Sequence, residues 1–165
     1  MNSESPPTKP VRKSLPHGVP LWLDSSTEVY FLTFTCRQRG SNQLCSQKTA
    51  TALLESVAYR HEAGLWFAHL FLLMPDHAHG LFSFPARGDE IQRVVSAWKG
   101  WTAKRCGIAW QRDFFEHRLR REESFLEKSD YIRHNPVRAG LVAEAGNWPW
   151  VLSASDQGGE LILGS

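Results

Sequence analysis

The chain has 165 residues and a formal net charge of +2, and 42% of its residues are hydrophobic, enough to bury the core of one domain, which excludes a largely disordered chain. Its three cysteines form no Cys-x-x-Cys pair and no segment approaches about 18 uninterrupted apolar residues, so a zinc ribbon, a redox dithiol and a membrane-spanning helix are disfavoured. Because the N-terminus also lacks an apolar signal segment, we expect a soluble cytoplasmic protein.

The first half of the chain predicts an arm followed by a strand, a helix and a hairpin. Five prolines in residues 1–22 predict a flexible, extended arm. The alternating segment 29–37 is rich in aromatic and β-branched residues and predicts a strand. Apolar residues at helical spacing predict a helix over 46–64. Segments 65–74 and 77–84 predict two strands joined by a tight Pro-Asp turn.

The second half predicts two more helices and one more strand. Residues 89–106 begin with acids and end with bases, as the helix dipole favours, and predict the second helix. Residues 113–120 can form a fourth strand, and 122–135 predict a third helix that Pro136 stops. The closing residues 152–165 predict a flexible tail.

This order of elements predicts an α+β fold with a ferredoxin-like antiparallel sheet, two helices on one face and an additional C-terminal helix. Side chains alternate along strands, and both faces of the central hairpin are apolar, so both have to be covered. The first two helices can cover one face. The third helix is expected on the other, beside His77 and His79, whereas the same alternation puts His69 on the opposite face from this pair.

The stretch LLMPDHAHGLFSF (72–84) places His77 and His79 one residue apart in an apolar run. On a strand both would point the same way, with Cα atoms roughly 7 Å apart, so the two imidazoles could converge on one divalent ion. Two histidines rarely suffice for a metal, and a third ligand that carries oxygen is expected. For an isolated His-x-His pattern, a second interpretation has the same weight: two histidines at the edge of the core that are hydrogen-bonded to the backbone and bind no metal.

Tyr131 and Asn135 stand four residues apart, on one face of the third helix. Tyr131 could be a nucleophile and Asn135 an amide-oxygen ligand beside it. A phenol with a pKa of about 10 is a poor nucleophile at neutral pH, but a metal bound to a scissile phosphate would orient that phosphate and withdraw charge from it. The product would be a covalent phosphotyrosine and a free 3′ hydroxyl. The plainer alternatives are a packing tyrosine and an asparagine that ends the helix before Pro136.

Three motifs, MPDHAHGLF, WKGWTAKRCGIAWQRDFFEHRLRREE and DYIRHNPVRAGLV, occur in this order between about Tyr30 and Trp150. Together they resemble the REP-associated tyrosine transposases, relatives of the single-strand insertion-sequence transposases in the HUH endonuclease superfamily. The resemblance implies an HUH nuclease domain over 23–151, between the arm and the tail. The implied site residues are the metal ligands His77, His79 and Asn135 and the nucleophile Tyr131.

The resemblance further implies a bacterial, metal-dependent enzyme that cuts and rejoins single-stranded DNA at short palindromic hairpins. Its cofactor would be Mg²⁺ or Mn²⁺, and two imidazoles with one amide oxygen suit Mn²⁺ better than Mg²⁺. The expected partner is single-stranded or hairpin DNA, with no membrane, and a monomer is favoured over a dimer with exchanged helices. The alternative function is a hairpin-binding module that has lost catalysis. A histidine-triad hydrolase is rejected, because Leu81 stands where its third histidine would be.

Basic residues concentrate in the second half of the chain, where eleven Lys or Arg stand against six acids between Arg93 and Arg138, a net charge of +5. Such a surface suits phosphate contacts, although many solvated helices have a similar charge. The candidate DNA-binding residues are Lys99, His117, Arg118, Arg120, Arg121, Arg133 and Arg138. Candidates for stacking on bases are Trp98, Trp101 and Trp110, with burial the expected alternative for Trp98.

Overall fold

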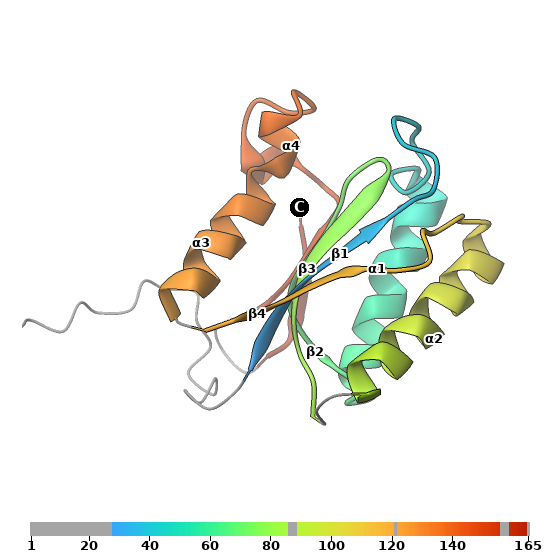
Figure 1. The fold of residues 1–165 in the computed structure, drawn as a ribbon. Coiled ribbons are helices and arrows are strands. Elements are labelled where there is room, and N and C mark those ends of the chain that lie inside the picture. Colours follow the sequence, from blue (N-terminus) through green and yellow to red (C-terminus); the bar gives the residue numbers. More distant parts are fainter. Residues whose placement is uncertain (1–27, 86–88, 121, 156–158, 165) are drawn as a thin grey trace, which may run out of the picture.

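The computed structural model describes residues 28–85, 89–120, 122–155 and 159–164 (Figure 1). The strands are β1 (Val29–Thr35), β2 (Phe67–Leu73), β3 (His77–Ser83), β4 (Phe115–Leu119), β5 (Val151–Ala154) and β6 (Leu161–Leu163). The helices are α1 (Gln47–Glu62), α2 (Asp89–Cys106), α3 (Glu122–Arg133) and α4 (Asn135–Arg138), with a 3-10 turn at Ala145–Asn147. Within these described residues no helix has the length and apolar character needed to cross a membrane. The arm expected over 1–22 lies outside them.

One six-stranded sheet organises the fold, in the order β4-β1-β3-β2-β5-β6, with every neighbouring pair antiparallel. Helices α1 and α2 lie on one side of this sheet, and α3 and α4 lie on the other (Figure 1). The predicted α+β class with an antiparallel sheet is therefore confirmed, and the third helix lies on the second face as expected.

Each face of the sheet has its own buried core. On the α1/α2 face, Trp98 packs on Phe34 and Phe71, and its indole N–H donates to Ser56 Oγ at 2.8 Å. On the α3 face, Phe125 and Ile132 belong to a second apolar cluster that includes strand residues such as Leu72 and Leu81. Burial on both faces explains why the central hairpin reads as apolar on both sides.

An irregularity in β2 reverses the alternation at its start. The register with β3 shifts between Ala68 and Leu70, so residues before the shift point to the face opposite to the one that simple alternation predicts. Ala68 joins the α1/α2 core, while the ring of His69 lies 5.5 Å from that of Phe125 in α3. The expectation that His69 faces away from the histidine pair is therefore wrong. His69, in β2, nevertheless lies beside the end of β3 opposite to the histidine pair, where its Nε2 atom is hydrogen-bonded to Ser83 Oγ at 2.8 Å.

The segment expected to be a flexible tail from residue 152 contains two strands in its described part. β5 pairs with β2, and β6 pairs with β5, which extends the sheet beyond the central hairpin. The Leu73 N–H also donates to the Trp150 carbonyl at 2.9 Å. The tail prediction is wrong for these segments because strands of four and three residues carry little sequence pattern, and they form by pairing with an edge that β2 already offers.

The proline at position 136 starts a helix instead of stopping one. α3 ends at Arg133, and Pro136 lies in the first turn of the short α4 that begins at Asn135. A proline costs nothing in the first turn of a helix, because its missing N–H would have had no partner there. The third helix thus ends two residues before its predicted end at residue 135, and α4 was not predicted.

Candidate functional site

The two histidines of the MPDHAH motif lie at the start of β3, on the face covered by α3. The centres of their rings are 4.9 Å apart, with an angle of 78° between the ring planes. His79 is buried and 6% exposed, and His77 is partly exposed at the strand end. The turn at Pro75-Asp76 and the β-strand alternation together bring the rings side by side, as predicted.

Each imidazole makes a hydrogen bond through its Nδ1 atom. The Asp76 carboxylate accepts from His77 Nδ1 with Oδ1 at 2.7 Å, and the Thr33 hydroxyl lies 2.9 Å from His79 Nδ1. Thr33 reaches His79 because the two residues are directly paired in the β1–β3 register. With Nδ1 engaged in both rings, Nε2 is the nitrogen that each histidine can offer to a metal.

Burial holds the His79 imidazole in its neutral form. Desolvation, the largest cause, and the nearby charges of His77, Arg138, Arg39 and Lys128 together lower the pKa of His79 to about 3. A neutral imidazole is the form that binds a metal ion. Hence His79 is chemically ready to act as a ligand at neutral pH.

Tyr131 of α3 lies against the histidine pair of its own chain. Its ring centre is 6.0 Å from that of His79 and 6.3 Å from that of Phe31, with edge-to-face geometry in both cases. The side chain is 42% exposed, so its packing leaves part of it open to solvent. A residue in this position can be reached by a nucleic-acid strand and is still held beside His79.

Asn135, one helical turn after Tyr131, has a buried amide nitrogen, Nδ2, that meets no hydrogen-bond partner in the part of the chain that the structure describes. A buried polar group left in this way is costly, and a bound ligand would relieve the cost. Rotation of the amide by half a turn would present its oxygen in place of its nitrogen. No group of three His, Cys, Asp or Glu side chains that could hold a metal occurs among the described residues.

Positive charge gathers around Tyr131. The ammonium of Lys128 lies 4.9 Å from the Phe31 ring centre and 5.3 Å from that of Tyr131. The guanidinium of Arg138 lies 4.3 Å from the Tyr131 ring centre and donates to the Tyr131 backbone carbonyl at 2.6 Å. Arg39 forms an ion pair at 3.3 Å with Asp76, the residue bonded to His77. These cations create a potential that attracts phosphate.

Sequence reasoning missed Lys128, Arg39 and Asp76. Lys128 could have been found, since it precedes Tyr131 by three residues and so shares its helix face. Asp76 reads as an ordinary turn residue, although it is buried and bonded to His77. Arg39 lies outside the basic second half of the chain, and no local pattern singles it out.

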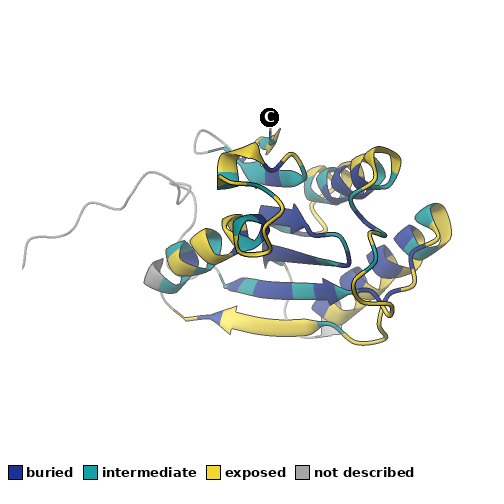
Figure 2. Ribbon diagram, turned by 90° about the horizontal axis from the view of Figure 1, so that it is seen from above, coloured by how far each residue is buried: buried dark blue, intermediate teal, exposed yellow. Residues whose placement is uncertain are grey.

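The other DNA candidates are scattered. β4 forms an exposed edge of the sheet, visible as the yellow strand in Figure 2. His117 is paired with Phe31 and therefore shares the face of the histidine pair, whereas Arg118 points to the other face and forms an ion pair with Glu28 at 2.8 Å. Arg120 is exposed just after β4, and Arg133 is two residues from Tyr131, on a different side of α3. Arg121 lies outside the described residues.

Lys99 and two of the three candidate tryptophans are buried inside the protein. Lys99 is buried, and its ammonium donates to the carbonyls of Gln111 and Arg112 at 2.8 Å each and of Asp113 at 3.3 Å. All three of its donors are thus used inside the protein, so the predicted phosphate contact is wrong. Trp98 and Trp110 are buried, while Trp101 is 43% exposed and stays available for stacking.

Replacing Lys99 by methionine is expected to destabilise the fold by about 3 kcal/mol, because three carbonyls would lose the charged donor that the buried Lys99 supplies. The measurement is urea unfolding followed by circular dichroism. Lys104→Met, at an exposed position of the same helix, is the matched control and should stay within about 0.5 kcal/mol of the parent. Equal stabilities of the two variants would contradict the structural role.

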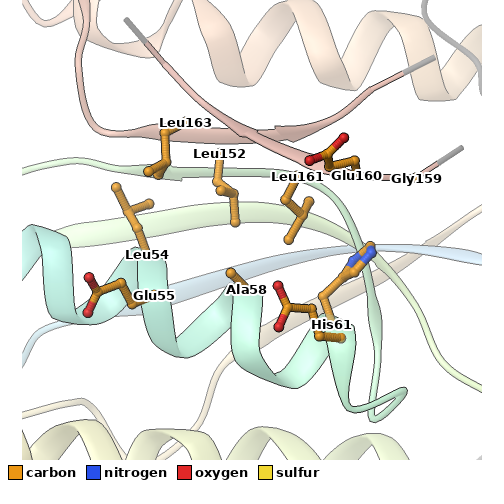
Figure 3. Close-up of a pocket in the computed structure, with 10 residues that line it drawn as sticks. Leu54, Glu55, Ala58, His61, Leu152, Gly159, Glu160, Leu161 and Leu163 are labelled. Carbon is orange, nitrogen blue, oxygen red and sulfur yellow. The ribbon is translucent and has the colours of Figure 1, made fainter. Parts of the chain in front are cut away.

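A separate pocket of about 370 Å³ lies between α1 and the β5–β6 hairpin (Figure 3). Its lining is mixed, with leucines such as Leu54 and Leu161 beside the polar side chains of His61 and Glu160. None of the metal, nucleophile or DNA candidates lines this pocket. The histidine pair and Tyr131 therefore lie outside this pocket, on the α3 face of the sheet.

Comparison with known proteins places this arrangement in context. No protein-family model matches the chain. It is 28% identical over 126 residues to the REP-associated tyrosine transposase of Escherichia coli K12, covering 73% of each chain. It is 30% identical over 95 residues to a Haemophilus influenzae protein provisionally named as a REP-associated tyrosine transposase, covering 47% of this chain and 53% of that one.

A solved structure of a REP-associated tyrosine transposase bound to a REP hairpin has the same fold. It matches with a TM-score of 0.66 and 24% identity, over 87% of this chain and 82% of that chain. The resemblance predicted from the three motifs is confirmed by the curated relative and agrees with the fold.

Proposed function

We propose that this chain, which is similar to the REP-associated tyrosine transposases, is a metal-dependent endonuclease and strand transferase for single-stranded DNA that acts on palindromic hairpins through a covalent phosphotyrosine. The observation that carries the proposal is the position of Tyr131, whose ring lies 6.0 Å from that of His79 in the same chain. We also assign the ferredoxin-like plan to the first four strands and two helices, with α3 as the added helix that carries the nucleophile.

The residues present fit a divalent ion. His77 and His79 would each offer Nε2, since their Nδ1 atoms are hydrogen-bonded, and Asn135 would offer its amide oxygen. Bound Mg²⁺ or Mn²⁺ would polarise and orient the scissile phosphate. Because the ligand set contains no carboxylate, we expect Mn²⁺ to be held more tightly than Mg²⁺.

The chemical step proposed for Tyr131 is an in-line displacement. Its phenolic oxygen attacks the phosphorus and loses its proton, a Tyr–O–P bond forms, and the bond between phosphorus and the 3′ oxygen breaks. The departing 3′ oxygen takes up a proton and becomes a hydroxyl. Attack of a 3′ hydroxyl on the phosphotyrosine reverses the sequence and rejoins a strand. Phe31 supports the tyrosine ring, and Lys128 and Arg138 attract the phosphate that has to approach it.

The test uses a hairpin oligonucleotide labelled at its 3′ end, because the fragment attached to the tyrosine keeps its 5′ phosphate and that end. With Mn²⁺, a labelled adduct that survives denaturing electrophoresis is expected, and EDTA should prevent its formation. Hairpin binding without any adduct, with either metal and across the neutral pH range, would favour the alternative of a non-catalytic binding module.

Lys128→Ala and Arg138→Ala are each expected to weaken hairpin binding and to reduce the slope of log affinity against log salt by roughly 1, because each removes one cation beside Tyr131. Fluorescence anisotropy at several salt concentrations measures both quantities. Arg105→Ala removes an exposed cation at the end of α2, on the other side of the sheet, and should leave affinity and slope unchanged. An equal effect of all three substitutions would mean that only net charge matters.

A further inference from the structure

We propose that Asp76 is a positioning residue of the metal site, which fixes the orientation and the tautomer of His77 and thereby sets the affinity for the ion. The inference rests on the proposed function, since it takes His77 as a metal ligand. It assigns a task to a residue that the sequence presents only as part of a turn.

The two oxygens of the Asp76 carboxylate have separate partners. Oδ1 accepts from His77 Nδ1 at 2.7 Å. Oδ2 accepts from the Gly40 N–H at 2.7 Å and pairs with Arg39 Nε at 3.3 Å. The residue is only 8% exposed, so these contacts are largely shielded from water. A carboxylate held at both oxygens cannot swing away from the imidazole without losing all three contacts.

The backbone on either side of the carboxylate is also tied down. The Asp76 carbonyl accepts from the Cys36 N–H at 2.9 Å, and the Pro75 carbonyl accepts from the N–H groups of Gln43 and Leu44 at 2.8 and 3.0 Å. These bonds attach the turn before β3 to the loop that follows β1. The position of His77 at the start of β3 is therefore set by a rigid support and not by a free loop.

The chemical consequence is a fixed tautomer. A carboxylate only accepts hydrogen bonds, so the proton of a neutral His77 must sit on Nδ1, and the lone pair of Nε2 is left for the metal. The hydroxyl of Thr33 can donate or accept, so it orients His79 without choosing a tautomer. Asp76 also puts a negative charge in contact with a ligand set that otherwise consists of neutral imidazoles and an amide, with Arg39 nearby.

The test is Asp76→Asn, which keeps the size of the side chain but leaves it one acceptor atom for His77 and Gly40. Titration of Mn²⁺ into the full chain without DNA, followed by electron paramagnetic resonance, is expected to show binding 10- to 100-fold weaker than in the parent. Asp113→Asn is the matched control, because it makes the same change at an exposed position just before β4, and its affinity should stay within about threefold of the parent. An Asp76→Asn affinity equal to that of Asp113→Asn would overturn the proposal.

Two further measurements separate this proposal from the proposed function. His77→Ala should lose Mn²⁺ binding; if it binds like the parent, the metal site itself is wrong. In the metal-free parent protein, nitrogen-15 spectra of the histidine rings should show the His77 proton on Nδ1. A proton on Nε2 in that spectrum would overturn the role of Asp76 even if Asp76→Asn fails to fold and whatever the metal titration shows.

Discussion

Replacement of Tyr131 by phenylalanine is expected to abolish the covalent DNA adduct and to lower strand cleavage on the order of 10³-fold or more. The substitution deletes one oxygen, the atom that the proposal makes the nucleophile. It keeps the ring that packs edge-on against His79 and Phe31, so the fold and the histidine pair should be unaffected. The measurement is the adduct assay with the labelled hairpin, in parallel with hairpin affinity.

The matched control is Tyr59→Phe, which removes the same hydroxyl from a tyrosine that is 67% exposed on α1, on the other side of the sheet. This variant should form the adduct as the parent does. Unchanged affinity with loss of the adduct in Tyr131→Phe would separate chemistry from binding. Persistent cleavage by Tyr131→Phe would remove this residue from the nucleophilic role.

The second large effect is acid destabilisation of the metal-free protein. Desolvation by burial lowers the pKa of His69 and that of His79 from 6.5 to about 3. Above pH 6.5 these imidazoles are neutral in both the folded and the unfolded protein, and their contribution to stability is fully present. Below it the unfolded chain takes up protons that the folded chain accepts only near pH 3. The free energy of unfolding should therefore decrease as the pH is lowered from 6.5 towards 3, by up to about 1.4 kcal/mol per pH unit for each histidine.

The measurement is urea unfolding at several pH values between 7.5 and 4.5. Carboxylates also titrate in part of this range, so the informative quantity is the difference in slope between variants. His69→Gln removes one of the two buried sites and should lower the slope by about 1.4 kcal/mol per pH unit. His117→Gln, at an exposed position of β4, should leave it unchanged. Identical slopes for His69→Gln and the parent would show that His69 titrates normally in the folded protein.

Local patterns predicted most of the framework. The periods of strands and helices follow from short-range geometry, so the segments that became β1, β2, β3, α1 and α2 were recognisable from their own residues. The alternation along β3 placed His77 and His79 on one side, and the resemblance carried by three motifs is confirmed by the curated relative. The α-helical repeat also puts Lys128, three residues before Tyr131, beside it.

By itself, the sequence determined the order and type of the main elements, the shared face of the two histidines and the spacing of Tyr131 and Asn135. Each of these features depends only on residues that are close together in the sequence. Only the tertiary structure decided that β2 shifts register before Leu70, that β5 and β6 join the sheet and that the Lys99 ammonium lies among carbonyls. It also decided that Asp76 supports His77 from a turn anchored to a distant loop. The physical reason is that hydrogen bonds between remote segments form only once packing has brought those segments together, and no local period encodes them.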